Sequence, residues 1–346
     1  MSTVLVTGGA GFVATNLARR FLEDGHRVRV LDDLSRPGVE ENLRWLTQTG
    51  GDRLDVVIGS VCDEDTVAGA LAGVDTVFHL AAQVAVTTSL REPVLDLQTN
   101  LLGTVNLLEQ ARARRRPPVI VFTSTNKVYG ALDDVELCEL EGRYAPVDER
   151  LRARGISERR PLHFCTPYGC SKGGADQYVC DWASSFSVPS VVFRMSCIYG
   201  PHQFGTEDQG WVAHFMSAML ASDPITIYGD GRQVRDILYV GDLVEALTLA
   251  SEQAPELAGR AFNIGGGPDN AVSLRDVIAL ASELCESTPS VSYEDWRTGD
   301  QRWYVSDTAA FRRATGWEPR TPPRVGLAAL RDWLADAPAI ETATIR

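Results

Sequence analysis

The amino-terminal half of this chain alternates short apolar runs with longer amphipathic ones. The runs that read as strands are 4–7, 28–31, 55–58, 76–80, 119–123 and 190–194. The segments with helical periodicity between them are 12–24, 38–49, 63–72 and 94–114. Strands that are apolar along their whole length are buried on both faces, as in a parallel sheet between two helical layers. The sequence therefore predicts an α/β protein built on a doubly wound parallel sheet.

A glycine-rich segment, TGGAGFVA at residues 7–14, follows the first strand and opens the first helix. Gly8 and Gly11 would allow a tight turn and let the backbone approach a pyrophosphate at the helix N-terminus. Ala14, in the third glycine position, would still allow close helix–strand packing. Asp32 ends the second strand, 21 residues after Gly11. A carboxylate there binds the ribose hydroxyls of a dinucleotide and repels a 2′-phosphate, so the segment predicts a Rossmann-type NAD site rather than an NADP site.

Two alternatives remain open at this site. Asp32 and Asp33 are also suited to begin a turn before LSRP. Arg36 could meet either the adenine ring or a phosphate group.

The bulk composition narrows the class of ligand. A net charge of −13 argues against nucleic acid or an anionic membrane as a general partner. No run approaches the ~18 consecutive apolar residues of a membrane span, and no export signal precedes the first strand. The seven cysteines form no CxxC pair, and the five histidines show no ligand spacing. We therefore expect reduced thiols in a cytoplasmic protein without a metal site.

The pattern loosens after residue 196. Gly, Pro, His, Gln and Asp cluster at 200–210 and at 229–236, which suggests binding loops. The remaining expected elements are helices near 211–221, 240–253, 273–286 and 323–335 and strands at 225–228 and 261–264. We expect a Rossmann domain at 1–195 with a return segment at about 236–262, and a smaller, discontinuous α/β substrate domain at 196–346.

A tyrosine and a lysine in the segment PYGCSK supply the candidate chemistry. Tyr168 and Lys172 are four residues apart, so they lie on one helix face. A free phenol, with a pKa of ~10, is a poor base near neutrality, but a nearby ammonium and a nicotinamide ring lower that value. Tyr168 could then remove a hydroxyl proton while hydride leaves for NAD⁺, with Thr125 hydrogen-bonding the reacting oxygen. The alternative reading, a packed aromatic and a surface charge, is disfavoured by the glycine-rich segment and by STNKVYG upstream.

Motifs along nearly the whole chain resemble the extended short-chain dehydrogenase/reductase family of nucleotide-sugar epimerases and dehydratases. The segments are TGGAGFVA, LDDLS, HLAAQ, STNKVYG, PYGCSK, FRMSCIYGP, GDGRQVRDILYV, FNIGGG, RTGDQRWYVSD and GWEP. The resemblance implies that Thr125, Tyr168 and Lys172 form the catalytic trio. The cofactor-binding residues that it and the glycine-rich segment imply are Gly8, Gly11, Phe12, Val13, Asp32, Ser35, Arg36, Ser60, Val61, Leu80, Ala81, Ala82, Gln83, Asn100, Thr123, Tyr168 and Lys172.

Three positions depart from the family pattern. The dehydratases carry Asp-Glu after the catalytic Thr, as acid and base for eliminating water, and this chain has Asn126 and Lys127. An amide cannot transfer that proton, so dehydration is disfavoured. Ser60 stands where the family usually has an Asp for the adenine amine. Cys197 stands where many 4-epimerases have an Asn that contacts the substrate phosphates.

Five segments resemble the CDP-paratose/CDP-tyvelose 2-epimerases more than the UDP-galactose 4-epimerases. They span 79–89, 124–130, 164–178, 193–200 and 203–215. The subgroup implies oxidation of the sugar at C2 and re-reduction on the opposite face, with the cofactor bound throughout. The open alternatives are a UDP- or dTDP-sugar 4-epimerase, a UDP-uronate decarboxylase and a non-enzymatic NAD-sensing protein.

The ligand of this reaction is a nucleotide-diphosphate sugar, and its expected contacts lie in both halves of the chain. The resemblance implies that Arg235 and Arg302 bind the diphosphate, because a guanidinium can bind phosphate oxygens in a bidentate manner. The candidate substrate-binding residues are Gln83, Thr87, Ser89, Asn126, Cys197, Gln203, Trp211, Arg235 and Arg302. Core packing is the alternative for Trp211. The family also implies a homodimer that pairs helices near 94–114 and 168–186.

Overall fold

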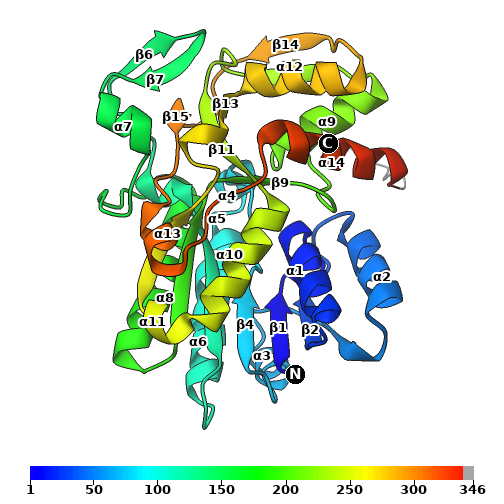
Figure 1. Cartoon of the computed structure of the whole chain (residues 1–346). Helices are drawn as coiled ribbons and strands as arrows, with labels where there is room; N and C mark the ends of the chain where they lie inside the picture. The colour runs from blue at the N-terminus through cyan, green and yellow to red at the C-terminus, as the bar shows by residue number, and fades with distance from the viewer. Residues whose placement is uncertain (338–346) are drawn as a thin grey trace.

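A seven-stranded parallel sheet forms the centre of the computed structural model, which describes residues 1–337 (Figure 1). Its order is β12-β8-β5-β4-β1-β2-β3, and every neighbouring pair is parallel. The strands are β1 (Thr3–Thr7), β2 (Arg27–Asp32), β3 (Leu54–Ile58), β4 (Thr76–His79), β5 (Val119–Thr125), β8 (Ser190–Met195) and β12 (Arg260–Ile264). The predicted fold class is confirmed.

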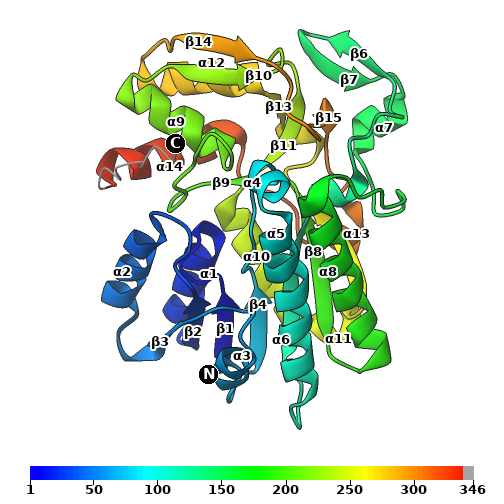
Figure 2. The same ribbon diagram turned by 180° about the vertical axis from the view of Figure 1, so that it is seen from behind.

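Helices cover both faces of this sheet (Figures 1 and 2). The helices concerned are α1 (Phe12–Glu23), α2 (Val39–Gly50), α10 (Val240–Glu252) and α11 (Ala254–Leu257) on one face, and α3 (Glu64–Ala70), α6 (Gly103–Arg112) and α8 (Thr166–Ser185) on the other. Successive residues of a strand point to opposite faces, so Val4 and Val6 pack with α1 and α10 while Leu5 packs with α3, α6 and α8. No helix within residues 1–337 has the length and apolarity needed to cross a bilayer.

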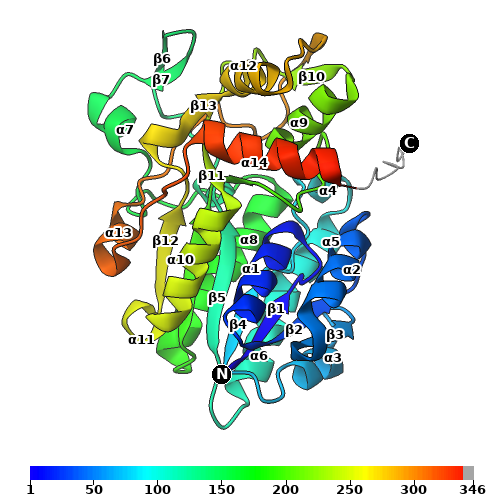
Figure 3. The same ribbon diagram turned by 45° about the vertical axis from the view of Figure 1, so that its right-hand side comes forward.

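Residues beyond β8 build a second layer above the carboxyl ends of the strands (Figure 1). Here β11 pairs in parallel with β9 and β15 and antiparallel with β13, while β10 pairs with β14. Helix α14 packs against α9 and α12 (Figure 3). The bounds are β9 (Cys197–Tyr199), α9 (Trp211–Ala221), β10 (Ile225–Tyr228), β11 (Val234–Tyr239), η4 (Pro268–Asn270), β13 (Ala271–Ser273), α12 (Leu274–Cys285), β14 (Val291–Glu294), β15 (Trp303–Tyr304) and α14 (Pro323–Asp336). Helix α13 (Ala309–Thr315) instead packs against β12 of the central sheet.

Two local expectations were wrong, and one insertion was not predicted. The expected loop at 229–236 ends early, because β11 begins at Val234 and buries even Arg235 and Asp236. The helix expected at 94–114 is divided, and α4 precedes it. The preceding helix α4 spans Val86–Arg91, and the pieces of the expected helix are α5 (Pro93–Leu97), the π-helical turn η2 (Gln98–Leu102) and α6. An insertion between β5 and α8 carries elements that the sequence pattern did not predict, β6 (Leu137–Leu140), β7 (Arg143–Pro146) and α7 (Glu149–Arg154).

Candidate active site

The glycine turn after β1 is shaped by contact with the backbone after β4. Gly8 has φ +66°, and a Cβ there would lie 2.8 Å from the Ala81 nitrogen, so no larger residue fits. The Gly11 N–H donates to the Gly8 carbonyl at 2.9 Å, and Gly11 is the N-cap of α1 with no side-chain cap. The first N–H groups of α1, from Phe12 and Val13 onward, are thus left for a ligand. This backbone cradle at a helix N-terminus fits the pyrophosphate of a dinucleotide.

Asp32, at the end of β2, is tied to the same turn. Its carboxylate accepts hydrogen bonds from the Ala10 N–H at 3.0 Å and the Leu34 N–H at 2.8 Å. Burial raises the pKa of this carboxyl, and the two backbone hydrogen bonds lower it. The carboxylate is therefore held at the strand end, beside the cradle, where a ribose binds in Rossmann folds.

Arg36 connects this region to the 200–210 loop. Its guanidinium donates to the Gln209 side chain and, at 3.5 Å, to the Phe204 carbonyl. Ser35, by contrast, is exposed and donates to the Asp33 carboxylate at 2.6 Å. The structure thus brings Arg36, but not Ser35, against the loop that carries candidate substrate residues.

The other expected cofactor residues follow the carboxyl ends of the strands. Ser60 and Val61 follow β3, residues 80–83 follow β4, and Thr123 lies in β5. The Thr7 hydroxyl accepts from the N–H groups of Leu80 and Ala81 at 3.2 Å each, which fixes the turn after β4 to β1. Because β1 and β4 flank the point where the strand order reverses, these residues surround the usual ligand crevice of a doubly wound sheet.

The three candidate catalytic residues meet where β5 ends and α8 begins. Thr125, Tyr168 and Lys172 are 7%, 9% and 3% exposed, so the site lies below the surface. The Lys172 ammonium donates to the Thr123 carbonyl at 2.6 Å and lies 4.2 Å from the centre of the Phe122 ring. Two residues of β5, Phe122 and Thr123, therefore hold the Lys172 amine in place.

The pKa of Tyr168 in the protein without cofactor is raised, whereas the sequence predicts that it is lowered when a nicotinamide ring is bound. Burial raises the pKa of Tyr168 to about 12, although a hydrogen bond with Thr125 lowers it, and the Asp96 charge raises it further. Burial also lowers the pKa of Lys172 to about 7, against the Asp176 and Asp96 charges. In the protein alone the phenol is therefore neutral at physiological pH. Activation requires a positive charge beside it, which fits a site completed by an oxidised nicotinamide.

A buried polar network behind the trio was not expected from the sequence. Asp96, which is fully buried, accepts hydrogen bonds from the side chains of Gln83 (2.8 Å), Asn100 (3.1 Å) and Ser171. Ser171 directly precedes Lys172 in α8. Three donors compensate the buried carboxylate, so Asp96 fixes α5, the π-helical turn and α8 to one another. The available signal was an acidic residue within the apolar run PVLDL.

Arg235 lies in a second charged cluster, with two partners that the sequence did not suggest. Its guanidinium donates to the Asp300 carboxylate at 2.6 Å and to the Gln301 carbonyl. The Lys127 amine donates to the Gly299 carbonyl at 3.0 Å and lies 3.7 Å from the same carboxylate. Segment 299–301 thus reaches the end of β5, and Arg235 is held near the catalytic edge.

The Arg302 side chain has different neighbours, since its guanidinium lies over the rings of Trp296 (5.3 Å) and Tyr144 (5.8 Å). Within residues 1–337 the side chains of Arg235 and Arg302 share no ion-pair partner, although both residues hydrogen-bond with the Val234 backbone. A further arginine that was not predicted, Arg297, stacks on the Tyr228 ring at 3.8 Å and pairs with carboxylates of the 200–210 loop. The joint grip of Arg235 and Arg302 on a diphosphate stays a prediction.

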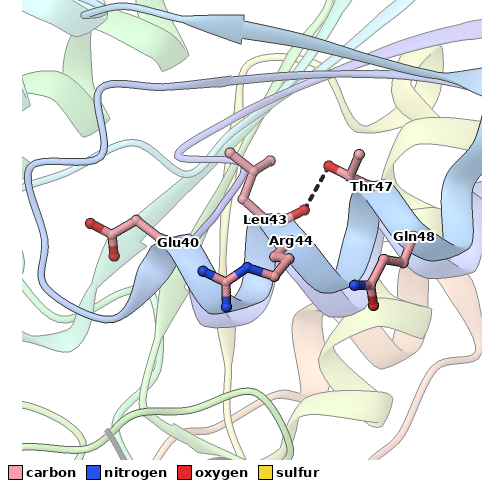
Figure 4. Close-up of a pocket in the computed structure, with 5 residues that line it drawn as sticks. All are labelled: Glu40, Leu43, Arg44, Thr47 and Gln48. Carbon is pink, nitrogen blue, oxygen red and sulfur yellow. Dashed lines mark hydrogen bonds between the residues drawn. The ribbon is translucent and has the colours of Figure 1, made fainter. Parts of the chain in front are cut away.

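Some of the remaining candidate substrate residues have hydrogen-bond partners within the protein, and others have polar atoms without a partner. The Trp211 indole donates to the Cys197 sulfur at 3.5 Å, Ser89 donates to the Val86 carbonyl of its own helix, and Asn126 contacts the Thr125 hydroxyl at 3.4 Å. Thr87 Oγ1, Ser124 Oγ and Gln203 Oε1 are among the seven buried side-chain atoms that have no hydrogen-bond partner within residues 1–337. Such atoms are costly in a closed protein, and here they fit a polar ligand. The open hollow along one side of α2, lined by residues 40–48, contains none of these groups (Figure 4).

We expect Asp32→Ala to weaken NAD binding by about 10- to 100-fold, the range for losing hydrogen bonds to a charged acceptor. The difference in binding affinity between NAD and NADP should become smaller, because the charge that repels a 2′-phosphate is removed. Calorimetric titration of cofactor-free protein measures both affinities. Asp33→Ala is the matched control, since that carboxylate is exposed and pairs with Ser35. Equal effects of the two changes would contradict the ribose role of Asp32.

The comparisons with known proteins agree with this geometry. Residues 4–265 match the NAD dependent epimerase/dehydratase family. The chain is 39% identical over 337 residues to the CDP-paratose 2-epimerase of Salmonella typhi, covering 95% of this chain and 98% of the relative. The structure of UDP-glucose 4-epimerase from Thermotoga maritima with UDP-glucose superposes with a TM-score of 0.83 at 29% identity, over 96% of this chain and 99% of that one.

A second solved structure carries the cofactor. UDP-glucose 4-epimerase from Thermus thermophilus in complex with NAD has a TM-score of 0.79 at 30% identity, over 97% of this chain and 100% of that one. The chain therefore belongs to the NAD-dependent epimerase/dehydratase family, with NAD as its cofactor.

Proposed function

We propose that the protein inverts C2 of a nucleotide-diphosphate sugar by transient oxidation and re-reduction. The observation that carries the proposal is the convergence of Thr125, Tyr168 and Lys172 beside the glycine cradle, with Asn126 and Lys127 next to Thr125. The similarity to the CDP-paratose 2-epimerase of Salmonella typhi supports C2 as the carbon. Similarity to 4-epimerases and dehydratases at about 30% identity supports the wider sugar-nucleotide class.

The chain's own residues supply binding and proton transfer. NAD⁺, when bound, accepts hydride from the sugar carbon and returns it. Tyr168 takes the hydroxyl proton as the ketone forms and gives it back when the alcohol is restored. Lys172, fixed by the Thr123 carbonyl, stabilises the phenolate, and Thr125 hydrogen-bonds the reacting oxygen. Because a sugar C–H without an adjacent carbonyl is too weak an acid for direct removal, this oxidation is what makes inversion possible.

Elimination of water does not suit the residues beside Thr125. Asn126 is buried, and its amide can neither give nor take a proton at neutral pH. Lys127 is held by the Gly299 carbonyl close to Asp300, and a cation there cannot serve as a base. The ketone is therefore expected to be reduced again rather than dehydrated.

Proton NMR of reactions with CDP- and UDP-hexoses tests the carbon that is inverted. Exchange between H2 epimers, with no net change in NAD, is the expected result. Inversion at C4 alone would replace the proposal with a 4-epimerase. Release of CO₂ from a UDP-uronate would indicate a decarboxylase instead.

We also propose that two copies of the chain pair through the helices beside the active site. An apolar surface lies on α4, α5, the π-helical turn and α8, which are neighbours on one face of the sheet (Figure 2). Its exposed members are Leu90, Val94, Leu95, Leu97, Leu102, Tyr178 and Phe186. Exposed apolar residues that gather on neighbouring helices are typical of a protein–protein interface. Adjacent helices on two copies would bury it as a four-helix contact.

We expect Leu102→Arg to convert a dimer into a folded monomer. Leu102 is 53% exposed, so the change should alter the free energy of unfolding by only about 0.5 kcal/mol while placing a charge inside the contact. Light scattering after gel filtration measures the mass. Val325→Arg, at an exposed site on α14, is the control and should leave the mass unchanged. A wild-type monomer at tens of micromolar would refute the contact.

A further inference from the structure

The use of lysine in this chain is unusual. Lys and Arg together number 33, but lysine occurs at positions 127 and 172 alone, and the other 31 are arginine. Arginine supplies a positive charge at every other site. It cannot replace lysine where a compact amine is needed, because the guanidinium is larger, planar and always charged. Lys172 is such a position, since it belongs to the catalytic trio. The same bias singles out Lys127.

Lys127 lies two residues after Thr125, in the short helix η3 (Asn126–Tyr129). Its backbone N–H donates to the Thr125 hydroxyl at 3.2 Å, and its side chain is 19% exposed. Burial lowers the pKa of the amine, the Asp300 charge raises it, and Arg235 lowers it. The amine therefore belongs to the same charged cluster as Arg235, at the edge where the catalytic hydroxyl lies.

The hydrogen bonding of this amine is incomplete. An ammonium has three donors. Within residues 1–337 the Lys127 amine donates to one acceptor, the Gly299 carbonyl, because Asp300 at 3.7 Å is beyond hydrogen-bond distance. Asp300 is already bonded to Arg235 at 2.6 Å. Two donors of the amine are thus left for a ligand with hydroxyl or carbonyl oxygens, on a residue whose backbone is bonded to the Thr125 hydroxyl.

A purely structural role would not require lysine. Elsewhere the chain ties a carbonyl and a carboxylate together with arginine. Arg143 donates to the Ala271 carbonyl at 2.8 Å and lies 3.6 Å from the Asp276 carboxylate, nearly the same arrangement. If Lys127 only fixed segment 299–300, arginine would serve there as well.

We propose that Lys127 contacts the sugar of the substrate, through hydrogen bonds from its amine to ring hydroxyls next to the reacting carbon. The proposal rests on the nucleotide-sugar function given above and assigns one of its specificity-determining residues. Lys172 and Lys127 then have separate tasks. Lys172 acts on the catalytic phenol, and Lys127 acts on the position of the sugar.

The test compares ligands with and without the sugar. Lys127→Met and Lys127→Arg are titrated calorimetrically, as NAD-loaded protein, with CDP-glucose and UDP-glucose and with CDP and UDP. We expect both variants to lose about 10- to 100-fold in affinity for the sugar nucleotides, the range for one or two hydrogen bonds from a charged donor. Affinity for CDP and UDP should stay within about twofold of the wild-type value, since these ligands have no sugar for Lys127 to contact. Arg143→Met is the matched control, expected to bind all four ligands as wild type does.

The outcomes separate the two proposals. Equal losses for nucleotides and sugar nucleotides would make Lys127 a structural tie, and full affinity in Lys127→Arg would refute the need for an amine. A wild-type protein that binds none of the four ligands would overturn the nucleotide-sugar function itself, and the sugar contact with it.

A second readout uses the scarcity of lysine. Incorporation of lysine labelled with ¹³C at Cε gives NMR signals from only two side chains and leaves their amines intact, because the chain has no other lysine. The signal that Lys127→Met removes is that of residue 127. We expect it to shift when CDP-glucose or UDP-glucose is added and to stay in place with CDP or UDP. A signal that shifts equally with both kinds of ligand would contradict the sugar contact.

Discussion

Replacing Tyr168 with Phe is expected to reduce turnover by about 10²- to 10⁴-fold, the usual contribution of a general acid–base group, and in practice to abolish it. The phenol oxygen is the group that takes and returns the sugar proton, and Phe keeps the ring that is packed at the start of α8. NAD should stay bound, because the glycine cradle and Asp32 are untouched. Turnover is followed by NMR, and retained NAD by mass spectrometry of the purified protein.

Tyr293→Phe provides the matched control. This tyrosine lies in β14 and is 55% exposed, so losing its hydroxyl should change neither turnover nor NAD content. Unchanged turnover in Tyr168→Phe would refute the catalytic assignment. It would also revive the view that the protein senses NAD without chemistry.

The largest effect on stability is expected from Asp176→Ala. Asp176 and Arg194 form a buried bidentate pair, with N–O distances of 2.8 and 2.9 Å and side chains 0% and 6% exposed. Removing the carboxylate leaves the guanidinium buried with the Tyr129 hydroxyl at 3.2 Å as its remaining side-chain partner. We expect the free energy of unfolding to fall by about 3–5 kcal/mol. Denaturation with urea measures the change.

An exposed pair serves as the comparison. Arg19 and Glu23 lie on the surface of α1, at 51% and 56% exposure, one turn apart. Glu23→Ala should cost below about 1 kcal/mol, because solvent screens such pairs. If the two variants lost the same stability, the buried pair would not hold α8 to β8 as the geometry indicates.

The sequence was sufficient for those parts of the fold and site that depend on local spacing. The strand–helix alternation, the glycine turn and the four-residue separation of Tyr168 and Lys172 are all readable within short windows. Contacts between distant segments were not readable. Ser171 binds Asp96 across 75 residues, and Lys127 binds Gly299 across 172. The π-helical turn was equally hidden, because its residues carry ordinary helical signals.

The short helix α5 connects two features on its opposite sides. Its inner side carries Asp96, which binds Ser171 beside Lys172, and its outer side carries Val94, Leu95 and Leu97 in the apolar patch. Five residues make barely more than one helical turn. A shift of the helix caused by contacts on its outer side therefore also moves the Asp96 carboxylate. If two copies pair there, the position of Asp96, and through Ser171 that of Lys172, depends on self-association. The activity per molecule would then depend on protein concentration, falling as dilution separates the copies.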